Sequence, residues 1–534
     1  MTTYATTVKW GKENLSLNLD PSLGPAGLKQ QLHALTNIPI DRMKIMAKSK
    51  NLWKGILKDD ADLTSFPFES PVQLLLMGSA EKLPDKPAVK VVFLEDLPEE
   101  EKAKVVEPSG LVNLGNTCYL NSVVQALRAI PHLRDGLRYY SNTRSNNGGD
   151  ASSSNRFLLT SLFSTLSTLD ASPQAISPNN LVMATKMSFP QMAQTGPGGR
   201  PMQQDAEEFY SGVLNVAAQE LQNTEALRAA FGKDEDWMGA KNVIDALFGL
   251  KMEEVLTCDE LPASIDQEAP VVTHDLHRKL VCNIQGANEA NITHVAEGIA
   301  LSLSGKVEKY SEALGRNAIY TRSQKIARLP PVIVVQFGRF YWKATPDSHD
   351  HAGVKCKVMK PVGFSSVFDV YEFCTEKVKS VLKVARDRAA AEEEERVAKK
   401  LKGETDADVD MDGNDEDEAA LQAALAMSVQ EDLSPVGPGL PNDFRGLYEL
   451  FAVVTHKGRD ADGGHYMGWV KADNSDSRNG SGSKQKIADT EEENEDWYVF
   501  DDDEVSPCKT EDILKLKGGG DWHMSYLNFY RAKK

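Results

Sequence analysis

The 534-residue sequence contains only six cysteines, and no two of them are spaced Cys-x-x-Cys. Sparse, scattered cysteines are typical of a reducing, intracellular compartment and give no support for a disulfide framework or a structural zinc site. The chain also lacks an uninterrupted apolar run long enough to span a bilayer. Its first residues, MTTYATTVKWGKENLSLNL, lack the apolar core of a secretory signal. The sequence therefore predicts an intracellular protein that does not span a membrane.

Basic residues are outnumbered, with 60 Lys and Arg against 78 Asp and Glu and a formal net charge of -18 at pH 7. Nucleic acids and anionic membranes attract basic surfaces, so this balance argues against either as the main partner. The length exceeds that of one ordinary domain, and no repeat of fixed period is present. We therefore expect more than one domain, one of them with a large core.

Residues 4–77 alternate strand-like and helical patterns. Strands are predicted over YATTVKW, LSLNL, DRMKIMAKSK and VQLLLMG, and a helix is predicted over GPAGLKQQLHALTN. This ββαββ order fits a small helix-on-sheet domain, and with the turn containing Ile38, Pro39 and Lys44 it resembles the ubiquitin-like β-grasp fold. The segment ends LLLMGSA, without the Gly-Gly end that conjugation needs, so the resemblance implies a docking domain over 1–80. An ordinary small α+β domain is the alternative.

A stretch rich in Pro and charge indicates a linker over 81–107, followed by one large domain over 108–532. Helices are predicted first, over 156–169, 180–187 and 204–221, and strands later, over 330–342, 447–458, 464–472 and 496–505. This order indicates an α+β domain with a cleft between its helices and its sheet. Two insertions are expected, 385–440 and 473–496. The first begins as a charged helix and continues into an acidic run without Lys or Arg.

Cys118 stands where the stretch GNTCYLNSVVQALRAIP turns helical. Asn116 and Thr117 are residue types that cap helices, and apolar residues recur behind them at helical spacing. The cysteine is either a small buried side chain, as most free cysteines are, or a thiolate favoured by the helix N-terminus. Its position alone does not decide between the two.

A thiolate nucleophile needs a base and a group that orients the base. His465, in DGGHYMGWV, and Asp501, in WYVFDDDEV, follow the cysteine in the order found in papain-like enzymes. Period-two alternation places Asp501 and Asp502 on opposite faces of their strand, and two antiparallel strands would bring His465 to one of them. Taken alone, each motif is equally compatible with a turn histidine or a solvated acidic cluster.

Together these motifs are more specific. GLVNLGNTCYLNSVVQAL resembles the cysteine box of the ubiquitin-specific proteases, GGHYMGWVK with WYVFDDDEV resembles their histidine box, and QQDAEEFY matches an element between the two. With the N-terminal domain and the final GGGDWHMSYLNFY, the chain looks like the proteasome-associated members of that family. The resemblance implies a papain-like catalytic domain of fingers, palm and thumb.

Site roles come from the resemblance, position by position. It implies Cys118 as nucleophile, His465 as general base and then acid, Asp501 as the group that orients His465, and Asn113 as an oxyanion donor. The residues expected to contact ubiquitin are Asp205, Glu208 and Tyr466. No metal or other cofactor is implied, because the zinc-binding cysteines that many family members carry are missing here.

The implied function is hydrolysis of the isopeptide bond after the C-terminal glycine of ubiquitin. The expected partners are ubiquitin, polyubiquitinated proteins and, through residues 1–80, the proteasome regulatory particle; nucleic acid and membrane are not expected. A monomer in cytoplasm and nucleus is expected, with loops at 341–360 and 458–464 able to cover the cleft. The alternative function is a ubiquitin-binding scaffold without catalysis, which an intact set of catalytic residues argues against.

The first insertion contains DEDEAALQAALAMSVQED, residues 415–432. Four of its residues share one helical stripe and resemble the ubiquitin-interacting motif, namely Leu421, Ala424, Leu425 and Ser428. The alternative is an amphipathic helix whose small apolar face packs on the domain. A second, tethered ubiquitin site would raise avidity for ubiquitin chains through effective concentration.

Replacement of Ala424 and Ser428 by Asp in the full chain should weaken binding of ubiquitin chains, because both positions lie on the predicted contact stripe. Turnover of a single-ubiquitin fluorogenic amide should not change. Retention of chains on immobilised protein measures the first quantity and steady-state kinetics the second. Equal chain retention by the variant and the wild type would contradict the motif.

Overall fold

The structure is a computed structural model of the whole chain. It describes residues 3–48, 51–78, 108–146, 153–232, 237–261, 269–285, 291–343, 354–403, 435–459, 463–472 and 496–533, apart from single-residue gaps at 12, 37, 223, 238 and 521. The chain divides into two compact units, Met1–Val105 and Val106–Lys534. In the described part of the chain, no helix is long and apolar enough to cross a bilayer.

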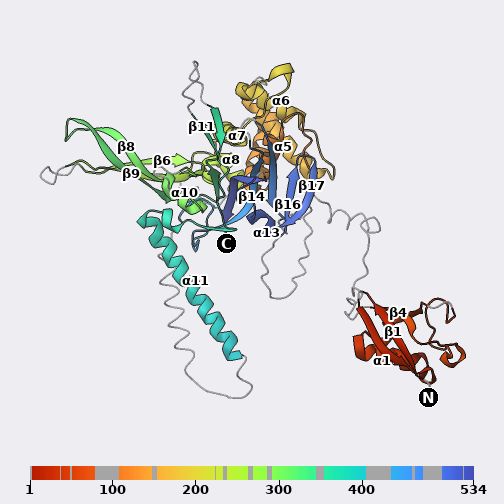
Figure 1. Ribbon diagram of the computed structural model, residues 1–534. Helices are drawn as coiled ribbons and strands as arrows, with labels where there is room; N and C mark the ends of the chain where they lie inside the picture. The colour runs from red at the N-terminus through yellow and green to blue at the C-terminus, as the bar shows by residue number, and fades with distance from the viewer. Residues whose placement is uncertain are drawn as a thin grey trace. The chain divides into compact units, whose positions relative to one another are not determined.

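The N-terminal unit is a four-stranded sheet with one helix packed on its inner face (Figure 1). Its elements are β1 (Tyr4–Trp10), β2 (Glu13–Leu19), α1 (Gly24–Thr36), β3 (Lys44–Ala47) and β4 (Val72–Met77), with the 3₁₀ turns η1 (Pro21–Leu23), η2 (Ile40–Arg42) and η3 (Leu63–Ser65). The strand order is β2-β1-β4-β3, with β1 and β4 parallel. Alternation in β4 buries Leu74 and Leu76 against Leu28 and Leu32 of α1 and leaves Met77 exposed. The ββαββ order predicted from sequence is confirmed.

The second unit begins with helices. They are α3 (Cys118–Arg128), α4 (Pro131–Asn146), α5 (Ser154–Ala171), α6 (Asn179–Ser188), α7 (Ala206–Glu220), α8 (Thr224–Phe231) and α9 (Val243–Phe248), with the 3₁₀ turns η5 (Pro190–Ala193) and η6 (Pro197–Gly199). The three helices predicted in this region are confirmed as α5, α6 and α7. All residues of α3 are buried, because this helix lies between the other helices and a sheet.

That sheet has the order β17-β16-β15-β14-β18-β10-β7, with β13 also paired to β14. Its strands are β7 (Leu280–Cys282), β10 (Val332–Phe337), β13 (Val367–Asp369), β14 (Leu447–Lys457), β15 (His465–Lys471), β16 (Asp496–Asp501), β17 (Glu504–Lys509) and β18 (Met524–Ala532). In β10, Val332 and Val334 join the core shared with the helices, whereas Ile333 and Val335 join a second core on the opposite face. Both faces of the sheet are therefore covered, which explains its continuous apolar runs.

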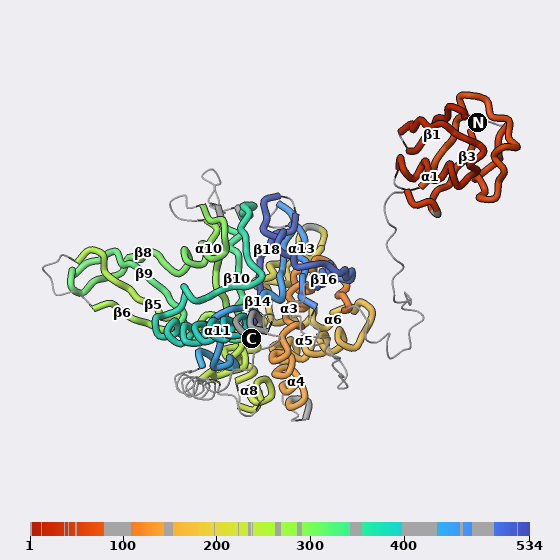
Figure 2. The backbone as a smooth tube through the Cα atoms, turned by 90° about the horizontal axis from the view of Figure 1, so that it is seen from below, coloured from red at the N-terminus to blue at the C-terminus, as the bar shows by residue number. Residues whose placement is uncertain are grey.

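A second sheet, of order β6-β5-β9-β8, extends away from the rest of this unit in both views (Figures 1 and 2). Its strands are β5 (Leu250–Cys258), β6 (Val271–His277), β8 (Ser304–Ser311) and β9 (Arg316–Arg328). The remaining elements are α10 (Val295–Ser302), the hairpin of β11 (Phe340–Lys343) and β12 (Val354–Lys357), η8 (Tyr371–Phe373), α11 (Glu376–Gly403) and α13 (Thr510–Leu514).

The charged helix expected to start the first insertion at 385 begins earlier, at Glu376. Val378, Leu382 and Ala385 are buried at helical spacing, the first two in the second core, so the first turns of α11 belong to the domain. The helix then projects outward (Figure 1). The predicted linker, the 415–432 segment and all of the second insertion except Asp496 lie outside the described residues.

A single arginine separates two strands that the sequence pattern joins. The run 330–342 is split into β10 and β11, and Arg339, between them, is fully buried. Its guanidinium donates to the carbonyl oxygens of Ser525, Val358, Lys360 and Lys517 at 2.7, 3.2, 3.0 and 3.1 Å. One side chain therefore joins β18, the stem of the β11–β12 hairpin and the segment after α13.

Arg339→Met should lower the free energy of unfolding of the second unit by about 3 kcal/mol or more, since four buried carbonyls lose a charged donor. Urea titration followed by tryptophan fluorescence measures this. The control is Arg316→Met, because Arg316 pairs with Glu260 at the surface with its side chain 57% exposed. A comparable loss in both variants would contradict the role given to Arg339.

Candidate active site

The three residues predicted to form a catalytic triad lie together. Cys118 is the first residue of α3, His465 the first residue of β15 and Asp501 the last residue of β16. His465 Nε2 lies 2.5 Å from Asp501 Oδ1. Antiparallel pairing of β15 with β16, in which Gly468 faces Phe500, explains how residues so far apart in the chain meet.

The electrostatics of His465 suit a base paired with a thiol. Its hydrogen bond to Cys118 raises the pKa of His465 to about 9, a hydrogen bond to Asp501 adds to the rise, and burial opposes it. Because Nε2 faces Asp501, the nitrogen available to the thiol is Nδ1. A ring that stays protonated at neutral pH is the partner that a cysteine thiolate needs.

The start of α3 is not capped as the sequence suggested. Thr117 occupies the N-cap position, but it makes no side-chain cap hydrogen bond. Its hydroxyl accepts from the Leu114 amide at 2.9 Å, and Asn116 Nδ2 donates to the Pro201 carbonyl at 2.8 Å. Thr117 therefore binds the preceding loop and Asn116 binds Pro201, and Thr117 does not cap the first turn of α3.

Asn113 is held beside the triad by Asp502. Asn113 Nδ2 donates to Asp502 Oδ2 at 2.8 Å, and its Oδ1 accepts from the Gly115 and Thr117 amides at 2.9 and 3.2 Å. One amide hydrogen is therefore committed to Asp502, and the other is the one that an oxyanion would use. The oxyanion role of Asn113 stays a prediction.

Asp502 has a role of its own that the sequence did not reveal. Its Oδ1 accepts from Asn121 Nδ2 at 2.8 Å, so its carboxylate joins the loop before Cys118 to α3. The backbone φ of Asp502 is 54°, in the left-handed region that non-glycine residues seldom adopt. This tight turn between β16 and β17 lets two successive carboxylates serve one site: Asp501 bonds His465, whereas Asp502 bonds Asn113 and lies 3.9 Å from His465 Nε2.

Gln203 is a further neighbour of the thiol to which sequence reasoning gave no role. Its Nε2 lies 3.5 Å from Cys118 Sγ and donates to the Gly464 carbonyl at 2.6 Å. Cys118 is 1% exposed in this arrangement. The position of Gln203 in the QQDAEEFY element was the available signal, but nothing in the local sequence pattern indicates that the Gln203 amide contacts a cysteine.

The residues predicted to contact ubiquitin come from the start of α7 and from β15. Asp205 caps α7 by accepting from the Glu207 amide at 2.8 Å, and it also accepts from the Tyr526 hydroxyl at 2.7 Å. Glu208 is exposed on the first turn of α7. Tyr466 is 3% exposed, with its ring against His456, so it offers almost no surface in this arrangement. Their roles stay predictions, and Leu421, Ala424, Leu425 and Ser428 lie outside the described residues.

Among the described residues, His465, Asp501 and Asp502 could bring three metal-ligand atoms within 4.8 Å of one another. Those atoms are engaged otherwise. His465 Nε2 and Asp501 Oδ1 share a hydrogen bond, and both oxygens of Asp502 accept asparagine amides. The cluster is thus explained by acid–base and positioning roles, and a metal there would have to break them.

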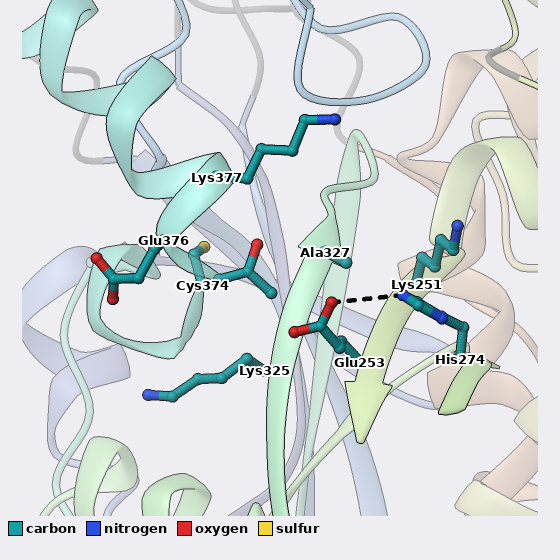
Figure 3. A pocket seen from close by; sticks show the side chains of 9 residues that line it. Lys251, Glu253, His274, Lys325, Ala327, Cys374, Glu376 and Lys377 are labelled. Atoms are coloured by element: carbon teal, nitrogen blue, oxygen red, sulfur yellow. Dashed lines mark ion pairs between the residues drawn. The ribbon is translucent and has the colours of Figure 1, made fainter. Parts of the chain in front are cut away.

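A separate hollow of about 560 Å³ lies among β5, β6, β9 and the start of α11 (Figure 3). It contains mixed charges, with an ion pair of 3.4 Å between His274 and Glu253. Burial raises the pKa of the Cys374 thiol in its wall to about 12, so this cysteine is a neutral side chain. The hollow contains none of the triad residues.

A cysteine at a helix start, a histidine paired with it and an aspartate behind the histidine define a cysteine peptidase of the papain-like order. Residues 109–530 match the family model described as "Ubiquitin carboxyl-terminal hydrolase". The chain belongs to this family, and it is a cysteine deubiquitinase.

Relatives match along nearly the whole chain. Ubiquitin carboxyl-terminal hydrolase 6 of Arabidopsis thaliana is 35% identical, over 99% of this chain and 98% of its own length. Ubiquitin carboxyl-terminal hydrolase 6 of Schizosaccharomyces pombe is 32% identical, over 98% of each chain. Ubiquitin carboxyl-terminal hydrolase 14 of Caenorhabditis elegans is 26% identical, over 98% of this chain and 93% of its own. One solved structure, the SAGA Ubp8/Sgf11/Sus1/Sgf73 DUB module bound to ubiquitin aldehyde, aligns with a TM-score of only 0.46 at 17% identity, covering 80% of this chain and 70% of that chain.

Asp501→Asn and Asp502→Asn should slow hydrolysis of a ubiquitin C-terminal fluorogenic amide in different ways. In Asp501→Asn, loss of the carboxylate lowers the pKa of His465, so the alkaline limb of kcat/KM moves from about pH 9 to lower pH. In Asp502→Asn, the rate falls because one asparagine amide loses its acceptor, and the limb moves less than in Asp501→Asn because Asp502 Oδ2 lies 3.9 Å from His465 Nε2, beyond hydrogen-bond distance. We expect losses on the order of 10²-fold for Asp501→Asn.

The matched control is Asp503→Asn, the same change at the exposed neighbour, which should leave the profile unaltered. Cys118→Ala, which lacks the nucleophile, gives the background rate of hydrolysis in the assay. An alkaline limb that moves equally in the variants of Asp501 and Asp502 would contradict the division of roles between them.

Proposed function

We propose that this deubiquitinase acts on ubiquitinated proteins bound to the proteasome, recycling ubiquitin and regulating their degradation. The observation that supports hydrolysis is the assembled pair of Cys118 and His465, with Asp501 2.5 Å behind the ring. An inactive ubiquitin-binding scaffold would have no use for a histidine whose pKa is raised by the thiol. The intact site therefore favours the enzyme over the scaffold.

The reaction follows from these groups. The Cys118 sulfur adds to the carbonyl carbon of the C-terminal glycine of ubiquitin, and the carbonyl oxygen becomes an oxyanion that the second amide hydrogen of Asn113 would stabilise. His465 gives its proton to the leaving lysine amine as the C–N bond breaks, which leaves a thioester. The neutral ring then takes a proton from water, whose oxygen displaces the sulfur and frees ubiquitin.

The N-terminal unit is proposed to be a ubiquitin-like docking domain for the proteasome regulatory particle. Its sheet order and single covering helix support this fold. The face of β3 and β4 that α1 does not cover carries Met46, Leu75 and Met77, the last 42% exposed. An apolar outer face beside the exposed Lys44 suits a protein partner.

In the second unit, the helices from α3 to α9 are proposed as the thumb, the large sheet as the palm and the β6-β5-β9-β8 sheet as the fingers. Ubiquitin would lie against the fingers with its C-terminal tail leading to Cys118. Asp205 and Glu208 at the start of α7 would face basic residues of that tail. A monomer in cytoplasm and nucleus completes the proposal.

Leu75→Asp with Met77→Asp should reduce co-purification of the enzyme with proteasomes at least tenfold, because the outer face of β4 becomes charged. Hydrolysis of the ubiquitin amide by the free enzyme should not change. The control is Leu35→Asp, which adds one negative charge at a residue of α1 that is 52% exposed and lies outside the core of this unit. Undiminished co-purification of the double variant would contradict docking through this face.

A further inference from the structure

The turn that joins β14 to β15 reaches the catalytic thiol in two ways. His465 directly follows its last residue, Gly464. The Gly464 carbonyl accepts from Gln203 Nε2 at 2.6 Å, and this amide lies 3.5 Å from Cys118 Sγ. The position of the turn therefore affects both the base and the amide that covers the sulfur.

A lysine from the neighbouring hairpin is bound to this turn. Lys357, the last residue of β12, places its Nζ 2.5 Å from His456 Nδ1, 3.2 Å from the His456 carbonyl and 2.7 Å from the Gly458 carbonyl. Three acceptors match the three N–H groups of an ammonium. Lys357 thus holds the end of β14 and the first residue of the turn.

The imidazole of His456 carries the link to the far end of the turn. Burial, and then Lys357, lower the pKa of His456 to about 3, so the ring is neutral. Because Nδ1 accepts from Lys357, Nε2 carries the hydrogen and donates it to the Gly463 carbonyl at 3.0 Å. A Cβ on Gly464 would lie 2.7 Å from the ring, so the turn also packs directly on His456.

Among the described residues, the charged groups that shift the pKa values of this pair are basic, namely Arg339, Lys355 and His523, and the neutral ring of Tyr466 packs on His456. Burial, and then Arg339, lower the pKa of Lys357 to about 7. Near pH 7 the amine is therefore protonated in about half of the molecules, and in that form it donates to all three acceptors.

We propose that Lys357 is a positioning residue for the deubiquitinase reaction. Directly and through His456 it fixes the two described ends of the turn, Gly458 and Gly463–Gly464, and with them His465 and Gln203 around Cys118. Lys357 does not touch the thiol itself. Lys357 thereby couples the β11–β12 hairpin to the catalytic centre, so a shift of the hairpin changes the position of His465 relative to Cys118.

Lys357→Met keeps the length of the side chain and removes its three donors. We expect kcat for the ubiquitin amide to fall tenfold or more with KM changed less than threefold, because small misplacements of a base are costly and Lys357 does not bind substrate. Alkylation of Cys118 by iodoacetamide, read by mass spectrometry, should become faster as the Gln203 amide loses its fixed carbonyl.

The matched control is Lys360→Met, the same change three residues along the chain, which should behave as wild type in both assays. Its activity also shows that the family reaction is being measured, so failure of this proposal is distinguishable from failure of the proposed function. Unaltered kcat and alkylation in Lys357→Met would overturn the proposal.

His456→Leu provides a second variant should Lys357→Met fold poorly. It removes both ring nitrogens, so the acceptor of Lys357 and the donor to the Gly463 carbonyl are lost together, and the expected loss in kcat is similar. Because both changes cut one connection, the double variant should lose no more than the worse single variant. Multiplied losses in the double variant would show that Lys357 and His456 act separately, and would overturn the coupling.

Discussion

The catalytic centre depends on one close contact between a helix and a sheet. α3 lies against β15 at Gly468, where a Cβ would come within 3.1 Å of the Ser122 carbonyl oxygen. Because glycine has no Cβ, the helix axis approaches the strand closely, and the first residue of α3 falls beside the first residue of β15. Cys118 and His465 are therefore neighbours as a result of packing at a point that takes no part in the chemistry. Pairing of β16 with β15 then adds Asp501.

Much of this arrangement was accessible from the sequence. Alternating patterns predicted the strands of the N-terminal unit and, in the second unit, those near β10, β14, β15 and β16, but not the β6-β5-β9-β8 sheet. The triad roles came from the resemblance of three motifs to the family. The run 330–342 was wrong as a single strand because Arg339 turns inward to bind four carbonyls, a need that arises only in the fold. The positioning roles of Asp502, Gln203 and Lys357 were not predicted for the same reason. Each role depends on partners that only folding brings near.

At the start of α3, the residues that the sequence predicts as helix caps do not cap the helix. Asn116 and Thr117 are good capping residues, yet their side chains bind the preceding loop and Pro201 instead. A side-chain cap would satisfy the first amides of the helix and occupy the space beside Cys118. Without such a cap, the helix N-terminus can interact with the negative charge that develops on sulfur and on the oxyanion. The helix start is less stable without a side-chain cap, but its backbone amides remain able to bind the charge that develops in the reaction.

The contacts that complete the site have very large sequence separations. Asp502 binds Asn113 and Asn121 across 389 and 381 positions. Such contacts form only when nearly all of the second unit is folded, so the site assembles cooperatively with the whole sheet. The second insertion is compatible with this because its ends meet in the ladder, where the Ala472 amide donates to the Asp496 carbonyl at 2.9 Å. The entropy of closing a loop grows slowly with its length, so residues can be added between β15 and β16 without weakening the pairing that brings Asp501 to His465.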